Sequence, residues 1–162
     1  MRPEDRDVFV YNQTKETFLA YHVKVAGTFL SRFVGLRRLD SIARGSGLWL
    51  QSVKSVHTFG MRFPLDVILL DRDNRVVALE ELVRPFRWVQ PRTQVRSALE
   101  LPAHSIFRSC TELGDQMMIE DYQTLSEGAV SQIRPQQARS PQDHGAALCP
   151  ALPSDKARRS VA

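Results

Sequence analysis

The sequence predicts a mainly β domain (α+β), in which an antiparallel or mixed sheet curls into a compact, barrel-like shape beside two short helices. Two observations support this fold class. Segments with strand periodicity outnumber those with helical periodicity by roughly three to one. The strands are short and separated by turn residues, as in closed or curled sheets. The 162 residues are enough for one domain and a further segment.

The first two elements are predicted strands. DVFVYN, at residues 7–12, is a short segment of strand-forming residues followed by turn residues. Apolar side chains then recur at every second position of residues 16–27, which predicts a strand with one apolar face. They are Leu19, Tyr21, Val23 and Val25. His22 falls on the more polar face, so we expect it at the surface.

A first helix is predicted within residues 27–36. Thr28 suits its N-cap and Gly35 its end. Between them, four apolar side chains recur at helical spacing: Phe29, Leu30, Phe33 and Val34. Residues 37–47 are polar and rich in glycine, which indicates a loop, and GLWLQSV then returns to extended structure.

The clearest hairpin spans residues 65–83. Two apolar runs flank residues 71–75, in which Asp73 and Asn74 suit a tight turn. Residues 67–70 are apolar at every position, as in strands that are buried on both faces. We therefore expect this hairpin to pass through the core, with helices or a second sheet covering it.

The remaining segments predict a loop, a strand, the second helix and a last strand. Residues 82–99 contain Pro85, Pro91 and several arginines, which indicates a loop or a sheet edge. SALELP is a strand, and Pro102 suits the first turn of a helix. The apolar face of that helix would hold Ile106, Phe107 and Cys110. LGDQMMIED is a turn that leads into the last strand.

The chain divides into one predicted domain, residues 7–122, and a predicted disordered tail, residues 126–162. The tail contains four of the nine prolines and no phenylalanine, tyrosine or tryptophan. A segment with so few side chains to bury cannot offset the entropy lost on ordering it.

Composition narrows the class of protein. The net charge of +4 and the pI of about 9.4 favour anionic partners weakly. The two cysteines lie far apart and no His/Cys cluster accompanies them, so we expect no metal and no cofactor. The first residues lack the apolar region of a secretory signal, and the apolar runs are too short to span a bilayer. These features predict a soluble, cytoplasmic protein that does not bind membranes.

Four segments occur in a characteristic order: TFLSRFVGL, SVHTFGMRFPLDVILLDRDNRVV, ALELPA and LGD. Together they resemble the family called domain of unknown function 192 over most of residues 18–120. The resemblance implies a compact β-rich fold in bacteria and archaea, without an established activity. Members usually carry glycine where this chain has His104 and Cys110, near the two ends of the helix after ALELPA. Glycine at a helix end normally takes the left-handed conformation, in which cysteine costs about 1 kcal/mol.

His57 and Asp66 are the candidate catalytic residues, and they form a candidate ligand pocket with Thr58 and Met61. Histidine titrates near neutral pH, and a carboxylate can orient its ring. Each residue also has a structural interpretation. His57 would be half-buried and bond the backbone of a turn, and Asp66 would accept backbone N–H groups. The structural roles are favoured, because neither a nucleophile nor a metal partner is evident.

The arginine-rich loop is a second candidate site. Arg84, Arg87, Arg92 and Arg96 lie in it with the rings of Phe86 and Trp88, and no acidic residue occurs between Leu82 and Leu99. Guanidinium groups suit phosphates and carboxylates, and an exposed ring can stack on a base. Arg87 and Trp88 are therefore candidate ligand-binding residues. In the alternative interpretation, the rings face the core and the arginines are solvated.

Three functional hypotheses follow. The preferred one is a non-enzymatic binding module for a small anionic ligand or an acidic segment of another protein. The second is a small enzyme of the hydrolase or isomerase type that uses His57 and Asp66. The third is nucleic-acid binding through the loop from Arg84 to Arg96.

Overall fold

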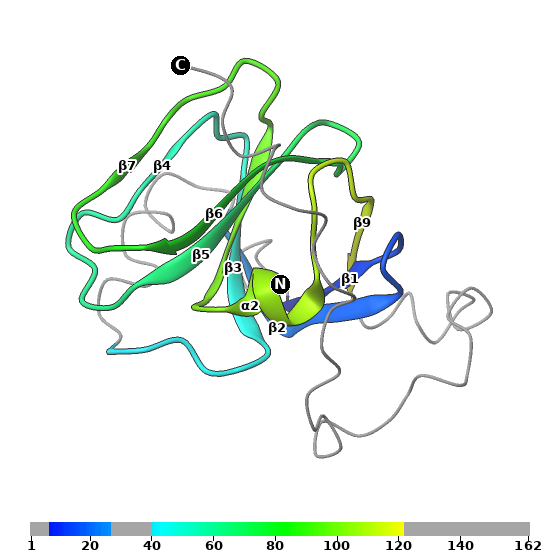
Figure 1. The fold of residues 1–162 in the computed structure, drawn as a ribbon, viewed down its shortest axis with the longest axis horizontal. Coiled ribbons are helices and arrows are strands. Elements are labelled where there is room, and N and C mark those ends of the chain that lie inside the picture. Colours follow the sequence, from blue (N-terminus) through cyan, green and yellow to red (C-terminus); the bar gives the residue numbers. More distant parts are fainter. Residues whose placement is uncertain (1–6, 27–39, 122–162) are drawn as a thin grey trace, which may run out of the picture.

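The structure is a computed structural model that describes residues 7–26 and 40–121. Within these residues strands dominate, and α2 (Ser105–Ser109) is the one helix. Figure 1 shows the strands arranged as a strongly curled sheet with α2 against its inner side. The predicted fold class is thus confirmed. The helix expected within residues 27–36 and the tail expected over residues 126–162 lie outside the described residues.

Seven strands form the main sheet in the order β6-β5-β8-β3-β2-β1-β9. Every neighbouring pair is antiparallel except β2 and β3, which are parallel. The strands are β1 (Asp7–Asn12), β2 (Thr17–Ala26), β3 (Ser46–Gln51), β5 (Leu65–Leu70), β6 (Val76–Val83), β8 (Ser97–Pro102) and β9 (Met117–Asp121). A separate small sheet pairs β4 (Val56–His57) with β7 (Trp88–Val89).

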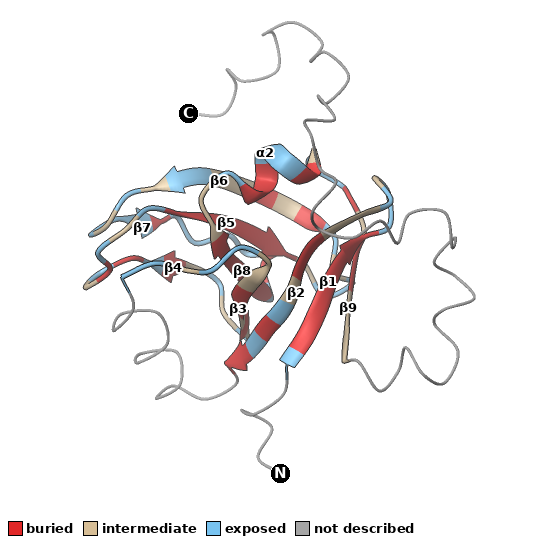
Figure 2. Cartoon of the chain, turned by 90° about the horizontal axis from the view of Figure 1, so that it is seen from below, coloured by how far each residue is buried: buried red, intermediate tan, exposed pale blue. Residues whose placement is uncertain are grey.

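The two edges of the main sheet meet at one corner. Arg75, just before β6, forms a bridge with Gln116, just before β9. Gly114 N–H donates to Val76 O at 2.8 Å, and Met117 N–H donates to Asn74 O at 3.0 Å. These bonds join the first and last strands of the sheet order, so the sheet is a half-barrel that closes at this corner (Figure 2).

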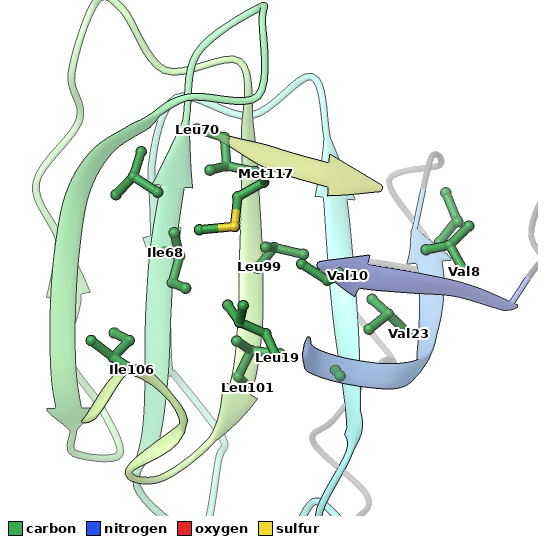
Figure 3. Packing of buried hydrophobic residues seen from close by; sticks show 13 residues of the cluster. Val8, Val10, Leu19, Val23, Ile68, Leu70, Leu99, Leu101, Ile106 and Met117 are labelled. Atoms are coloured by element: carbon green, nitrogen blue, oxygen red, sulfur yellow. The ribbon is translucent and has the colours of Figure 1, made fainter. Parts of the chain in front are cut away.

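The hydrophobic core has two main parts, one on each face of the sheet. The first core fills the concave side and brings together residues of β1, β2, β5, β8, β9 and α2, as Figure 3 shows. The second core lies on the other face of β3, β5, β6 and β8, where Val56 of β4 and Val89 of β7 cover it. The sheet therefore separates two buried layers.

The predicted hairpin is confirmed as the centre of the fold. All six residues of β5 are buried, and β5 pairs with β6 on one side and β8 on the other. The turn is held by Asp71, whose Oδ1 accepts N–H groups of Asp73 at 2.8 Å and Arg75 at 2.9 Å. Asn74 takes a left-handed conformation with φ of 59°, which asparagine tolerates better than most residues.

The second predicted helix exists but begins later than expected. Pro102 is the last residue of β8, and a turn separates it from α2, which begins at Ser105. The turn is closed by the Ser105 hydroxyl, which donates to Pro102 O at 2.6 Å. Ile106 is buried as predicted, but Phe107 is 61% exposed. The buried side of this short helix holds Ser105, Ile106 and Ser109, and Phe107 falls outside it.

The residues that flank α2 take the conformations that the family's glycines imply. His104, at the N-cap, has φ of 67°, and Cys110, at the C-cap, has φ of 52°. Both angles lie in the left-handed region, in which side chains with a Cβ are strained. The resemblance thus predicted the backbone of this helix better than its sequence did.

A buried polar network ties the β1–β2 hairpin to the turn before β9. Asn12 Nδ2 donates to Asp115 Oδ2 at 2.8 Å and to Thr111 Oγ1 at 3.3 Å. Asp115 Oδ2 also accepts Glu112 N–H at 2.9 Å. The Asn12 side-chain oxygen accepts the N–H groups of Thr14 and Lys15. This network explains why an aspartate follows Leu113-Gly114 in the LGD motif.

Candidate functional site

The small sheet belongs to a two-stranded ribbon that lies over the second core. We call residues 53–61 and 84–96 the β4–β7 ribbon. In its register, Val56 pairs with Val89, and His57 pairs with Trp88. Both valines are buried in the second core. Because side chains alternate along a strand, His57 and Trp88 project from the outer face of the ribbon.

Thr58 holds the two halves of the ribbon together. Its side chain is buried, and its hydroxyl donates to Arg84 O at 2.7 Å and accepts Arg87 N–H at 2.9 Å. Its backbone N–H donates to Arg87 O, and its carbonyl accepts the N–H groups of Phe86 and Met61. The hydroxyl is therefore engaged by backbone groups, and its role is structural rather than ligand-binding.

Aromatic rings cover the outer face of the ribbon. The His57 ring stacks on Phe59, with ring centroids 5.1 Å apart, and lies 6.1 Å from the ring of Trp88. Phe59 and Trp88 are 6.3 Å apart. Trp88 is 55% exposed, and Phe86, in the turn before β7, is 67% exposed. The interpretation in which Phe86 and Trp88 face the core is therefore wrong.

The ribbon carries positive charge and no acidic residue. Its cationic side chains are Lys54, Arg84, Arg87, Arg92 and Arg96, and all five residues are exposed. The Arg96 guanidinium donates to the carbonyls of Thr93 and Val95 within its own loop. The other four form no ion pair with any described residue. Exposed rings and cations thus occur together on the ribbon, an arrangement that suits an anionic partner with an apolar part.

Asp66 is a structural carboxylate. It is fully buried in β5, its Oδ1 accepts Leu82 N–H at 3.0 Å, and its Oδ2 accepts Ile106 N–H at 2.9 Å. The first bond holds a residue with φ of 53° at the end of β6. The second bond satisfies an N–H in the first turn of α2, which needs a partner because helix starts lack internal acceptors. These bonds match the predicted structural role.

The sheet places His57 and Asp66 on different sides. Asp66 faces α2 and the first core, through its bond to Ile106. Val67, the next residue, faces the second core, over which the ribbon lies. His57 projects outward from that ribbon, and its side chain forms no hydrogen bond with any described residue. It is exposed rather than half-buried, so the turn-bonding role predicted for it is not observed.

The other two residues of the predicted pocket also point elsewhere. Met61 is buried in the second core beside the ribbon, and the Thr58 hydroxyl is engaged as described above. Arg87 and Trp88, by contrast, are exposed next to His57. The candidate residues that share an accessible surface are therefore His57, Arg87 and Trp88, and Phe59 and Phe86 join them.

Glu100 is a further ionisable residue, which was not among the candidates predicted from the sequence. It lies in β8, within the ALELPA segment, and is 7% exposed. Burial raises the pKa of its carboxyl from 4.5 to about 7. The signal was present in the sequence, because a glutamate between two leucines breaks an otherwise apolar strand. A glutamate between two leucines is ordinary in a strand that has solvent on one face. It indicates a buried carboxyl only when both faces of the strand are buried.

Across the part of the chain that the structure describes, no helix is long and apolar enough to cross a membrane.

Two solved structures share the fold. A protein of unknown function from Novosphingobium aromaticivorans superposes with a TM-score of 0.60 at 17% identity, covering 69% of this chain and 83% of its own. A protein from Sinorhizobium meliloti described as a "putative transcription regulator" superposes with a TM-score of 0.58 at 18% identity, covering 70% and 92%. At these identities the likeness concerns the fold alone.

Sequence relatives identify the family. UPF0127 proteins of Thermococcus sibiricus and Thermococcus gammatolerans are 33% and 32% identical over 110 residues, which cover 65% of this chain and 71% of each relative. The profile of domain of unknown function 192, described as "Uncharacterized ACR", matches residues 10–119. This match spans well over half of the chain, from β1 to β9. The chain therefore belongs to the family of domain of unknown function 192.

Proposed function

We propose that the protein is a non-enzymatic binding module whose β4–β7 ribbon takes up an acidic segment of another protein. The observation that carries this proposal is the cluster of exposed rings at His57, Phe59 and Trp88 on a ribbon with five cations and no acidic residue. Aromatic and arginine side chains dominate the binding energy of protein interfaces. An acidic segment with one apolar side chain complements both features.

The geometry favours a protein segment over a small anion. The rings of Phe59, Phe86 and Trp88 are 39–67% exposed and lie on an outer face, whereas small-molecule sites usually enclose most of their ligand. An extended segment does not need enclosure, because it spreads its contacts over several exposed side chains. The cations would also speed association through electrostatic steering.

A binding assay with short peptides tests this proposal. The probes are acidic peptides with a single central tryptophan or leucine, and matched peptides in which that residue is serine. Trp88→Ala and Arg87→Glu should each weaken binding of the apolar-containing peptides by about tenfold or more. The matched controls are Phe107→Ala and Arg72→Glu, which change an exposed ring and an exposed arginine outside the ribbon and should leave binding unchanged. Equal affinity of wild type and Trp88→Ala would contradict the proposal.

Single-stranded nucleic acid is the second candidate partner. Exposed rings beside arginines also suit stacked bases and phosphates. Oligothymidylate serves as the probe in the same assay. Tighter binding of oligothymidylate than of any peptide, with an affinity that falls steeply as salt rises, would favour this candidate instead.

A further inference from the structure

Glu100 lies in the middle of the main sheet with its side chain in the second core. Its register partners are Leu48 on β3 and Val67 on β5, and both belong to that core. Leu99 and Leu101, on either side of it, point into the first core (Figure 3). Because side chains alternate across a strand, Glu100 projects to the opposite face, into the second core.

The carboxyl of Glu100 has no partner among the described residues. Burial is the sole cause of its raised pKa, so neither a hydrogen-bond donor nor a nearby charge acts on it. Asp66, by comparison, is fully buried and receives two N–H groups. A carboxyl without donors in an apolar layer is costly, and an aliphatic side chain of similar size would pack better. An unpaired buried polar group in a native protein therefore calls for a specific explanation.

The other charged groups of the neighbouring elements lie away from Glu100 or at a distance. Glu80 of β6 pairs with Val67 on the side of β5 away from β8. It therefore lies on the same face of the sheet as Glu100, two strands and about 10 Å away. Asp66 lies on the opposite face of β5. The inward-facing residues of the ribbon, Val56 and Val89, are apolar, and His57 and the cations of the ribbon are exposed. Lys24 of β2 is exposed and is the register partner of Leu48, so it lies two strands from Glu100 on the other side, also at about 10 Å. A row across the sheet therefore runs from Lys24 through Leu48, Glu100 and Val67 to Glu80.

Glu100 is not completely enclosed. The residue keeps 7% of its exposure, whereas Asp66 keeps none. This remaining exposure distinguishes Glu100 from the fully buried carboxyl of Asp66.

We propose that the second core contains a binding site for an alkyl ammonium ligand, whose ammonium group pairs with Glu100. The alkyl chain would lie along Leu48, the register partner of Glu100 that keeps 6% of its exposure. A buried carboxylate is stabilised by a paired positive charge with hydrogen bonds, and the aliphatic surroundings suit an apolar chain. A divalent metal ion fits less well, because it needs several oxygen ligands and this part of the row offers one carboxyl.

Titration calorimetry with n-hexylamine tests the proposal on the whole chain. n-Hexanol and hexanoate are the matched probes without the positive charge. At about pH 8 the wild type should bind n-hexylamine and neither matched probe. Because the ammonium group pairs with the ionised carboxylate, affinity should fall about tenfold for each pH unit below 7. This pH profile needs no variant, so it tests the proposal even if substitutions disturb folding.

Substitutions test whether Glu100 is the carboxyl that binds n-hexylamine. Glu100→Gln should weaken n-hexylamine binding by at least about tenfold and abolish its pH dependence. Glu81→Gln is the matched control, because Glu81 is exposed and adjacent to Glu80 but points to the other side of β6. Absence of amine binding to the wild type, or equal binding by Glu100→Gln and wild type, would overturn the proposal. A loss in Glu81→Gln as large as in Glu100→Gln would do the same, because it would indicate surface attraction of cations.

Discussion

Thr58 is enclosed and bonded by the backbone of the opposite half of the ribbon, whereas its neighbour His57 is exposed. The Thr58 hydroxyl contacts the backbone of Arg84 and Arg87. The described contacts of the His57 side chain are two aromatic rings. A histidine in a turn attracts functional interpretation more readily than a threonine. The sequence therefore led to the prediction that His57 holds the turn, whereas Thr58 does so.

Substitution of these two residues separates their roles. Thr58→Val removes the hydroxyl at nearly constant volume and leaves the Arg87 N–H without its acceptor, so the free energy of unfolding should fall by about 1–3 kcal/mol. His57→Ala removes a partly exposed ring contact and should cost about 0.5–1 kcal/mol. Denaturant unfolding of both variants checks this order. A loss in His57→Ala as large as that in Thr58→Val would restore a structural role for the histidine.

At the scale of elements, strands were easier to predict than the helix. Residues 65–70 are apolar throughout, and a run of this kind has one stable location, between two covered faces. The start of α2 depends instead on Asp66, which lies about 40 positions earlier in the chain and accepts Ile106 N–H from a different strand. Local capping signals cannot reveal such a partner. Pro102 therefore predicted a helix start that the tertiary contact places at Ser105.

The left-handed residue before α2 offers a stabilising change. His104 has φ of 67° and is exposed. Glycine at this position avoids the Cβ strain, and part of that gain is offset by the greater entropy of glycine in the unfolded chain. His104→Gly should therefore raise the free energy of unfolding by about 0.5–1 kcal/mol. His104→Ala keeps the Cβ and is the control. Thermal or denaturant melts that show equal stability for both variants would mean that φ at this position is not strained.

At the largest scale, the described residues form a half-barrel whose sheet separates two buried layers. The sheet encloses the concave core. The hydrogen bond from Ile106 N–H to Asp66 holds α2 against it. The β4–β7 ribbon lies over the second core, towards which Glu100 of β8 projects, and carries exposed rings and cations. The sequence predicted the barrel-like sheet, because strand periodicity is local. It could not predict which side of the ribbon faces solvent, because Val56 and His57 are adjacent and one step of register exchanges them.

Closure of the half-barrel at its corner gives a prediction for the fold as a whole. Asn12 and Asp115 join β1 to the turn before β9, and their direct hydrogen bond is 2.8 Å long. Each of Asn12→Ala and Asp115→Ala leaves buried polar groups without partners, so each should lower the free energy of unfolding by about 2–3 kcal/mol.

The double variant should lose less than the sum of the two single losses, because both substitutions remove the same bond. A double-mutant cycle measured by denaturant unfolding should give a coupling energy of about 1–3 kcal/mol. The control cycle combines Asn12→Ala with Thr58→Val, which belongs to a separate network in the ribbon, and should be additive within about 0.5 kcal/mol. Additivity in the Asn12–Asp115 cycle would show that the corner is held by the backbone bridge between Arg75 and Gln116 alone. The aspartate of the LGD motif would then contribute through its bond to Glu112 N–H rather than by closing the sheet.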